Sequence, residues 1–97
     1  MRNEIWTETA SFEYDQNIDY VLKRWSEKEA LRFIDKVESI LYDIKKGTVE
    51  YPLTEKGSVR KCVVTRQITL FYMIDVDNNL VLLSFWNNYQ DTERLEL

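Results

Sequence analysis

The residues that can do chemistry in this chain are lysines, arginines and tyrosines. The sequence has no histidine and one cysteine, which excludes histidine-based catalysis, an internal disulfide and a zinc site with ordinary ligand spacing. The segment from position 56 to position 74 contains four basic residues and no acidic residue. The basic residues are Lys56, Arg60, Lys61 and Arg66. They predict an anion-binding surface on strands. Cations that keep strand edges from aggregating are an equal alternative.

The remainder of the chain is acidic. A net charge of −4 argues against a protein that coats nucleic acid through its overall field. The first 47 residues hold ten acids against eight bases, so an anion-binding surface is expected away from this segment. Asp75 and Asp77 are the residue types that bind magnesium, but they flank a predicted hairpin turn and are expected to serve that turn. No metal site is expected.

Length and composition predict one globular domain over residues 1–97. Hydrophobic residues make up 44% and charged residues 31% of the sequence, as in ordinary soluble domains. No segment approaches the roughly 18 apolar residues of a membrane span, and the first residues lack the apolar stretch of a signal peptide. We therefore expect a cytoplasmic protein with no membrane partner and no small-molecule cofactor.

Two amphipathic helices are predicted in the first half of the chain. Thr7 or Thr9 can cap the first helix, and Ser26 with Glu29 fits a capping box that begins the second. Gly47, after two lysines, suits its end. The short connection predicts an antiparallel helix hairpin. The apolar stripes are Ala10, Tyr14, Ile18, Val21, Leu22 and Trp25, and then Ala30, Phe33, Ile34, Val37, Ile40, Leu41 and Ile44.

The second half of the chain switches to a period of two residues, which is typical of strands. Residues 59–64, 68–76 and 80–86 are predicted strands, with turns at 65–67 and 77–79, and they form a three-strand antiparallel meander. Residues 3–6 are too few to assign, although Ile5 and Trp6 are compatible with a short edge strand. The fold class is α+β, with the helix hairpin packed on one face of a small twisted antiparallel sheet.

The central strands carry large apolar side chains on both faces. Leu70, Tyr72 and Ile74 are the more uniformly apolar set and are expected to face the helices. The other face then presents one parity of the last strand, either Val81, Leu83 and Phe85 or its alternate. The predicted partner-binding set is Thr69, Phe71, Met73, Leu83 and Phe85. An apolar surface of this kind marks a partner site, and a C-terminal tail that folds back over it is the alternative.

Several segments together resemble the RelE/ParE superfamily of toxins from type II toxin–antitoxin modules. They are the Trp25-Ser26 junction followed by Ala30 and Phe33, the Val59-Arg60-Lys61 segment, the Leu70–Ile74 strand and the Asn-Tyr-Gln-Asp tail. The resemblance spans Ile5 to Leu95 and implies a helix pair on a twisted sheet, neutralised by a cognate antitoxin. It also implies one of two activities: cleavage of mRNA on the ribosome, or inhibition of DNA gyrase. A degenerate member that only binds an antitoxin is a third reading.

The nuclease branch of the resemblance implies a metal-independent site made of cations and a tyrosine. Such cleavage needs a group that activates the ribose 2′-hydroxyl, a donor to the leaving oxygen and positive charge on the phosphate. The matching residues here are Arg60, Lys61, Arg66 and Tyr89, with Arg94 beyond them. Lys61 would be the base, and Tyr89 would stack on the phosphate or donate a proton. The alternatives are a solvated strand lysine and a tail aromatic packed on Trp86.

Two departures from the resembling proteins remove positive charge from this cleft. Thr69 stands where many relatives have an arginine three residues before the tyrosine that matches Tyr72, which is itself expected to pack in the core. The tail reads Tyr89-Gln90 where close-looking relatives read arginine-glutamine. Because of the acidic net charge and these two losses, both activities stay open, and so does the question whether the chain is an enzyme.

Overall fold

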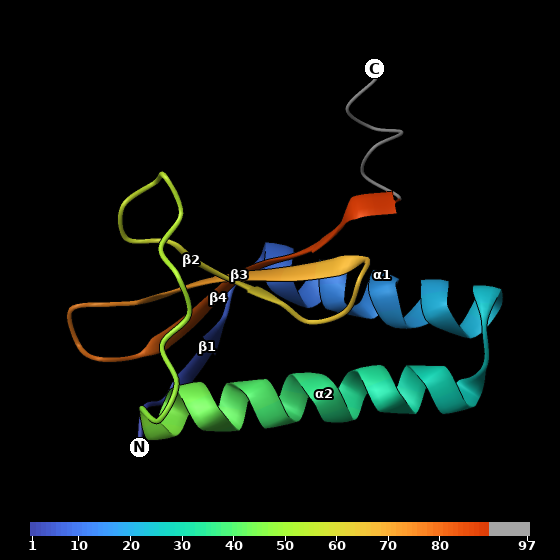
Figure 1. Cartoon of the computed structure of the whole chain (residues 1–97), viewed down its shortest axis with the longest axis horizontal. Helices are drawn as coiled ribbons and strands as arrows, with labels where there is room; N and C mark the ends of the chain where they lie inside the picture. Colours follow the sequence, from blue (N-terminus) through green and yellow to red (C-terminus); the bar gives the residue numbers. More distant parts are fainter. Residues whose placement is uncertain (90–97) are drawn as a thin grey trace.

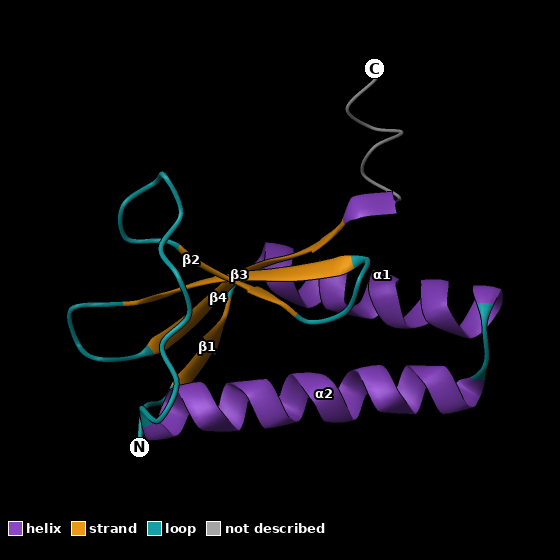
Figure 2. Cartoon of the chain, in the orientation of Figure 1, coloured by secondary structure: helices purple, strands orange, loops and turns teal. Residues whose placement is uncertain are grey.

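Two helices and four strands make up the fold (Figure 1). In this computed structural model residues 1–89 are described. The elements in chain order are β1 (Glu4–Trp6), α1 (Glu8–Arg24), α2 (Glu27–Lys46), β2 (Arg60–Val63), β3 (Ile68–Ile74) and β4 (Leu80–Asn87). Figure 2 shows the helices as an antiparallel pair joined at one end, with the strands gathered beside them. Neither helix has the length and apolar character that crossing a membrane requires.

The predicted helix hairpin is confirmed, and its ends have the expected chemistry. The Thr7 hydroxyl accepts from the Ala10 N–H at 3.1 Å, and the Ser26 hydroxyl accepts from the Glu29 N–H at 3.1 Å. Each bond satisfies an amide that the first helical turn leaves without an intrahelical partner. Gly47 ends α2 at a φ of 81°, a conformation that costs a residue with a Cβ considerably more.

The sheet has the strand order β1-β4-β3-β2. The meander of β2, β3 and β4 is antiparallel as predicted, and residues 4–6 do form an edge strand. That strand lies parallel to β4, so the sheet is mixed and the expectation of a purely antiparallel sheet is wrong in this detail. A parallel neighbour requires a long connection, which the helix hairpin and the meander supply between Trp6 and Leu80.

The core lies between the helix hairpin and one face of the sheet. Leu70 and Tyr72 are 0% and 1% exposed, and Ile74 packs against the same cluster. The prediction that this parity faces the helices is therefore confirmed. Trp6 adds an aromatic group to the core: its ring stacks on Phe85 at 5.5 Å and meets Tyr14 edge-on at 5.1 Å.

A β-bulge in β4 changes which residues face the core. Phe71 pairs with Ser84 and Tyr72 pairs with Leu82, so Leu83 is an extra residue on β4. Alternation between faces shifts by one position at such a bulge. Leu82 before the bulge and Phe85 after it are both in the core, 0% and 1% exposed. The expectation that Phe85 lies on the open face with Leu83 is wrong for this reason.

Polar side chains of α1 seal the edge of β4 beyond the bulge, where β1 no longer pairs with it. The Glu13 carboxylate accepts from the Phe85 N–H at 3.1 Å and from the Ser84 hydroxyl at 2.6 Å. Asn17 donates to the Phe85 carbonyl at 2.9 Å and accepts from the Asn87 side chain at 2.9 Å. Both asparagines are buried. Because the two asparagine side chains have left water, their bonds fix the position of α1 along the sheet.

Candidate functional site on the open sheet face

A hollow of about 710 Å³ lies on the face of the sheet opposite the helices. One wall is the loop between α2 and β2, and the floor is made by β2, β3 and the bulge of β4. Its lining residues are Leu53, Thr54, Glu55, Lys56, Val59, Lys61, Phe71, Leu83 and Ser84. Concave, mostly apolar sites with a few polar groups are the usual form of binding sites, so we take this open-face hollow as the candidate functional site.

The loop that walls the open-face hollow is held by its own backbone. The Thr54 N–H donates to the Val59 carbonyl at 2.7 Å, and the Lys61 N–H donates to the Pro52 carbonyl at 3.0 Å. Gly57 takes a φ of 70° at the turn, where a side chain would strain the backbone. In Figure 1 this loop, coloured green to yellow, stands out beyond β2. The sequence predicted Lys56 as part of an anion-binding surface, but it gave no indication that Leu53 and Glu55 lie at the sheet, because their position depends on how the loop folds back.

Lys61 is the one predicted catalytic residue that lines the open-face hollow. It stands opposite Phe71 in the β2–β3 register and is exposed. Lys56 joins it from the loop. No ion pair between described residues involves either lysine. The hollow thus offers two ammonium groups beside the Phe71 ring and Leu83, a combination suited to an anionic or mixed apolar and acidic ligand.

Arg60 lies on the opposite side of the sheet, because neighbouring residues of a strand point to opposite faces. It stands across from Tyr72 in the register. Its guanidinium donates to the Tyr51 carbonyl at 2.6 Å and pairs with Glu50 at 2.8 Å. The sequence grouped Arg60 with Lys61 in one anion-binding surface, and the structure places the two side chains on opposite faces of the sheet. The strand alternation that placed Tyr72 inward already indicated this separation.

The surroundings of Arg60 hold neutral aromatic and thiol groups. Burial, followed by a hydrogen bond with Cys62, raises the pKa of Tyr51 to about 12. Burial also raises the pKa values of Tyr72 and Cys62. Tyr72 accepts from the Tyr51 N–H at 3.3 Å, and its expected place in the core is confirmed. These groups stay protonated near neutral pH and serve packing.

Arg66 and Tyr89 lie together at another end of the sheet. Arg66 is exposed in the β2–β3 turn, where the Thr65 hydroxyl accepts from the Gln67 and Ile68 N–H groups. The Asn88 N–H donates to the Gln67 carbonyl at 2.7 Å, which brings Tyr89 to the same end. Gln90 and Arg94 lie outside the described residues. Neither Arg66 nor Tyr89 lines the open-face hollow, so the four predicted catalytic residues fall at three separate places.

The predicted partner-binding set fits the open face better. Phe71, Met73 and Leu83 are partly exposed there, while Thr69 is 8% exposed, opposite Trp86 in the register. The face also carries apolar residues outside the predicted partner-binding set: Ile5, Val63, Val81 and Trp86. We call Phe71, Met73, Val81, Leu83 and Trp86 the open-face patch.

The two aspartates near the β3–β4 hairpin serve that turn. Asp75 accepts from the backbone N–H groups of Asp77 and Asn79 at 3.0 and 2.8 Å, and Asn78 takes a φ of 66°. The backbone bond from Asn79 is the largest of the effects that together lower the pKa of Asp75. The expectation that Asp75 serves the turn is confirmed. Among residues 1–89 there is no group of three or more metal-ligating side chains.

Comparison with solved structures finds this fold in toxins of bacterial toxin–antitoxin systems. A chain of the chromosomal ParDE system of P. aeruginosa superposes with a TM-score of 0.72 at 14% identity, over 90% of this chain and 96% of that one. A chain of the E. coli DinJ-YafQ complex gives 0.62 at 13% identity, over 93% and 97%. The YoeB dimer of Staphylococcus aureus gives 0.61 at 16% identity, over 88% and 94%.

No protein-family model and no curated protein matches the sequence. At these identities the likeness is one of fold. The resemblance to RelE/ParE toxins that the sequence suggested is therefore matched by the whole described architecture, and the residues of the site have to carry any further conclusion.

Proposed function

We propose that this protein is the toxin of a type II toxin–antitoxin module and that its open sheet face is shared by the antitoxin and the target. The observation that carries the proposal is the open-face patch with its adjoining hollow, on a fold found in toxins of such modules. Both helices pack on the other face, so within residues 1–89 no helix covers Phe71, Met73 and Leu83. A contiguous exposed apolar surface of this kind marks a partner site.

The cognate antitoxin would cover the open-face patch with an extended or helical segment. β2 is the last strand of the sheet, and among residues 1–89 the bridge between Leu53 and Arg60 covers only its beginning. Val63 is 65% exposed on this edge. Edge strands and apolar grooves are the two surfaces that peptide segments recognise in this way.

For the target, we propose a protein of the DNA gyrase class. A metal-free nuclease needs its base, its proton donor and its phosphate-binding cations within hydrogen-bond reach of one phosphate. Here Arg60 is held on the opposite face by Glu50 and Tyr51, and Arg66 lies with Tyr89 outside the hollow. A toxin that acts by binding a protein needs no such convergence and tolerates a net charge of −4.

Ribosome-dependent mRNA cleavage is the second candidate, and one observation favours it. Lys56 and Lys61 line the same hollow beside the Phe71 ring, which is the pairing of cations with an aromatic face that single-stranded RNA prefers. If this candidate is right, Lys61 is the base and Lys56 contacts the phosphate.

Inducible expression of the full chain tests these alternatives. The proposal expects growth arrest, a DNA-damage response and intact transcripts by primer extension, with arrest relieved by the small protein encoded beside it. Transcripts cut at defined positions, with cleavage lost in Lys61→Ala and kept in Lys46→Ala, would establish the nuclease instead. A chain that binds the neighbouring protein but arrests nothing would be a degenerate member that only binds an antitoxin.

A further inference from the structure

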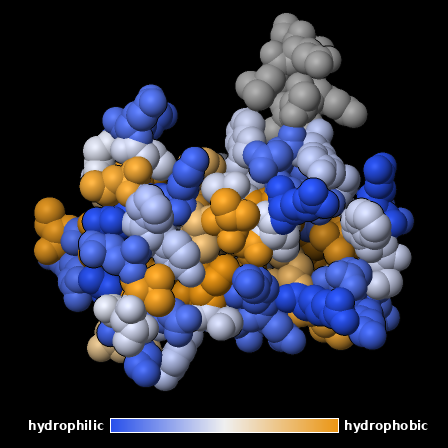
Figure 3. Space-filling model, viewed as in Figure 1, coloured by the Kyte–Doolittle hydropathy of each residue, from blue (hydrophilic) through white to orange (hydrophobic). Residues whose placement is uncertain are grey.

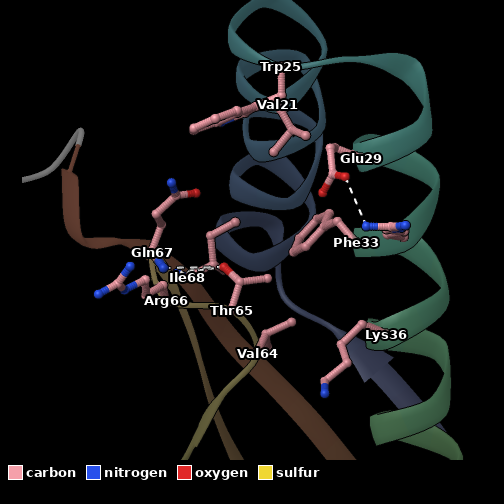
Figure 4. A pocket seen from close by; sticks show the side chains of 11 residues that line it. Val21, Trp25, Glu29, Phe33, Lys36, Val64, Thr65, Arg66, Gln67 and Ile68 are labelled. Atoms are coloured by element: carbon pink, nitrogen blue, oxygen red, sulfur yellow. Dashed lines mark hydrogen bonds and ion pairs between the residues drawn. The ribbon is translucent and has the colours of Figure 1, made fainter.

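Two hollows on the helix side of the molecule differ in the charge of their linings. The first, of about 390 Å³, lies where α1 and α2 join, against the β2–β3 turn. Figure 4 shows Trp25 at its top, with Lys36 and Arg66 on opposite sides below. In Figure 3 apolar side chains gather between α2 and the sheet, surrounded by hydrophilic ones. We call it the cationic hollow, because its charged lining residues are Arg32, Lys36 and Arg66 against Glu29.

The second hollow, of about 610 Å³, lies between β1, α1 and the second half of α2. Aromatic rings from all three elements line it: Trp6, Tyr14 and Tyr42. Between them the lining reaches Val37 and Leu41 of the core, which are 1% and 4% exposed. This hollow therefore offers flat aromatic surfaces over an apolar base, a lining that accepts a side chain with a planar or apolar body.

The charge of the second hollow is negative, and we call it the acidic hollow. Its carboxylates are those of Glu4, Asp35 and Glu38, and its base is Lys45. Lys45 is paired with Glu4 at 2.9 Å, while no ion pair between described residues involves Asp35 or Glu38. Burial, followed by the charge of nearby carboxylates, Glu38 first, raises the pKa of the Tyr14 phenol. Three acids and one base leave an excess of two negative charges beside the aromatic rings.

Two lysines of this chain show what the lining of the acidic hollow binds. The Lys45 ammonium contacts one oxygen of Glu4, and the other oxygen accepts from the Trp6 indole N–H at 2.7 Å. The Lys46 ammonium lies over the Tyr42 ring, 5.3 Å from its centroid. Carboxylates and aromatic faces are the two kinds of group that bind organic cations. The same two kinds of group continue along the hollow, beyond the reach of these lysines, at Asp35, Glu38 and Tyr14.

We propose that the acidic hollow binds an arginine side chain of a basic peptide segment from a partner protein. A planar guanidinium stacks on an aromatic face and donates to a carboxylate along its edge, whereas a lysine ammonium is a compact point charge. β1 borders the hollow and is an edge strand of the sheet, and edge strands and grooves are surfaces that peptide segments recognise. The hollow lies on the opposite side of the sheet from the open-face patch, so the inference does not depend on the proposed toxin function.

The indole N–H signals in NMR spectra of the full chain test this proposal, because each of the three tryptophans reports on one surface. Trp6 lines the acidic hollow, Trp25 lines the cationic hollow, and Trp86 belongs to the open-face patch. The probe is the blocked peptide acetyl-Gly-Arg-Gly-amide. Its control is the same peptide with citrulline, which keeps the shape of arginine without the charge. We expect the arginine peptide to shift the Trp6 signal until the site is saturated. The citrulline peptide should leave it in place, and neither peptide should shift the Trp25 or Trp86 signal.

Substitutions at exposed positions of the lining identify the groups that bind the peptide. Glu38→Gln and Asp35→Asn should each weaken its binding about two- to fivefold, the effect of losing one exposed ion pair, and Tyr42→Leu should weaken it by a similar factor. Asp19→Asn is the matched control, because it removes one negative charge at an exposed position of α1 that does not line the hollow. It should bind the peptide normally.

Three results would overturn the proposal. The Trp6 signal could stay in place, it could move alike with the arginine and citrulline peptides, or it could move together with the other two indole signals. Equal weakening by Asp19→Asn and Glu38→Gln would overturn the proposal as well, because the net charge of the chain, and not the acidic hollow, would then attract the peptide.

Discussion

The two faces of the sheet are built from the same strands with similar side chains, but one is buried and the other remains partly exposed. On the inner face Leu70, Tyr72 and Leu82 are at most 1% exposed beneath the helix hairpin. On the outer face Phe71, Met73 and Leu83 are of similar size and remain partly exposed. The alternation of apolar residues along a strand therefore does not distinguish a core face from a partner-binding face. What separates the two faces is how much chain is left to cover them, and in a small domain the helices cover only one.

The largest expected effect comes from truncating a leucine on each face. Leu82→Ala removes buried methyl groups and leaves a cavity, which costs about 2–5 kcal/mol of unfolding free energy. Leu83→Ala, one residue further on, trims a side chain that water already reaches and should cost well under half as much. Urea unfolding followed by circular dichroism measures both. Equal losses would mean that the outer face is also core.

The next expected effect concerns binding rather than folding. Met73→Asp places a charge in the middle of the open-face patch and should weaken binding of the antitoxin by at least about 2 kcal/mol, as charges at a central interface position do. Val76→Asp, at a fully exposed hairpin position, is the matched control and should bind normally. Calorimetric titration with the cognate antitoxin gives both values. If the two variants bind alike, the partner does not use this face.

A third effect comes from the polar seal between α1 and β4. Asn17→Ala removes the bond to the Phe85 carbonyl and the bond from the Asn87 side chain, and a buried carbonyl that loses its partner costs about 1–3 kcal/mol. Gln16→Ala, the exposed neighbour, should change little. Thermal unfolding compares them. A small loss for Asn17→Ala would show that water replaces its bonds and that the seal is not a fixed part of the core.

Particular residues show how much of the fold the sequence predicts. The caps at Thr7 and Ser26, the stop at Gly47 and the inward side of β3 all depend on neighbours a few positions away, and local chemistry predicted them. Phe85 was misplaced because a bulge leaves the apolar pattern of β4 unchanged while it moves every later residue to the other face.

The candidate site was harder to predict than the fold. The separation of Arg60 from Lys61 follows from strand alternation once Tyr72 is placed inward, so the sequence contained that signal. For Lys56 the sequence predicted only membership of an anion-binding group of four bases, because the fold of its loop places it beside the sheet. Asn17 carried no signal, because its place depends on a contact with residues distant in sequence. Asn17 meets β4 nearly seventy positions later, and a polar residue on an otherwise apolar helix stripe gives no indication of its partner.

The smallest expected effect is the pH dependence of the hairpin that joins the two central strands and so supports both faces alike. Hydrogen bonds to the Asp75 carboxylate, first of all from the Asn79 backbone, lower its pKa below the ordinary aspartate value of 3.8. A carboxyl whose pKa is lowered by folding stabilises the native state fully above the unfolded value. That contribution disappears as the pH falls through the lower folded value.

Asp75→Asn keeps the shape of the side chain and removes this titration. The difference in stability between the wild-type protein and Asp75→Asn should therefore be constant near neutral pH and shrink below about pH 3.8. Asp77→Asn is the matched control. It removes the neighbouring carboxylate, and residue 77 donates to Asp75 only through its backbone N–H, which the substitution keeps. Urea unfolding across this pH range measures the three proteins. A gap that widens with acid would mean that Asp75 is stabilised in its protonated form, and the turn would then be held by bonds other than these.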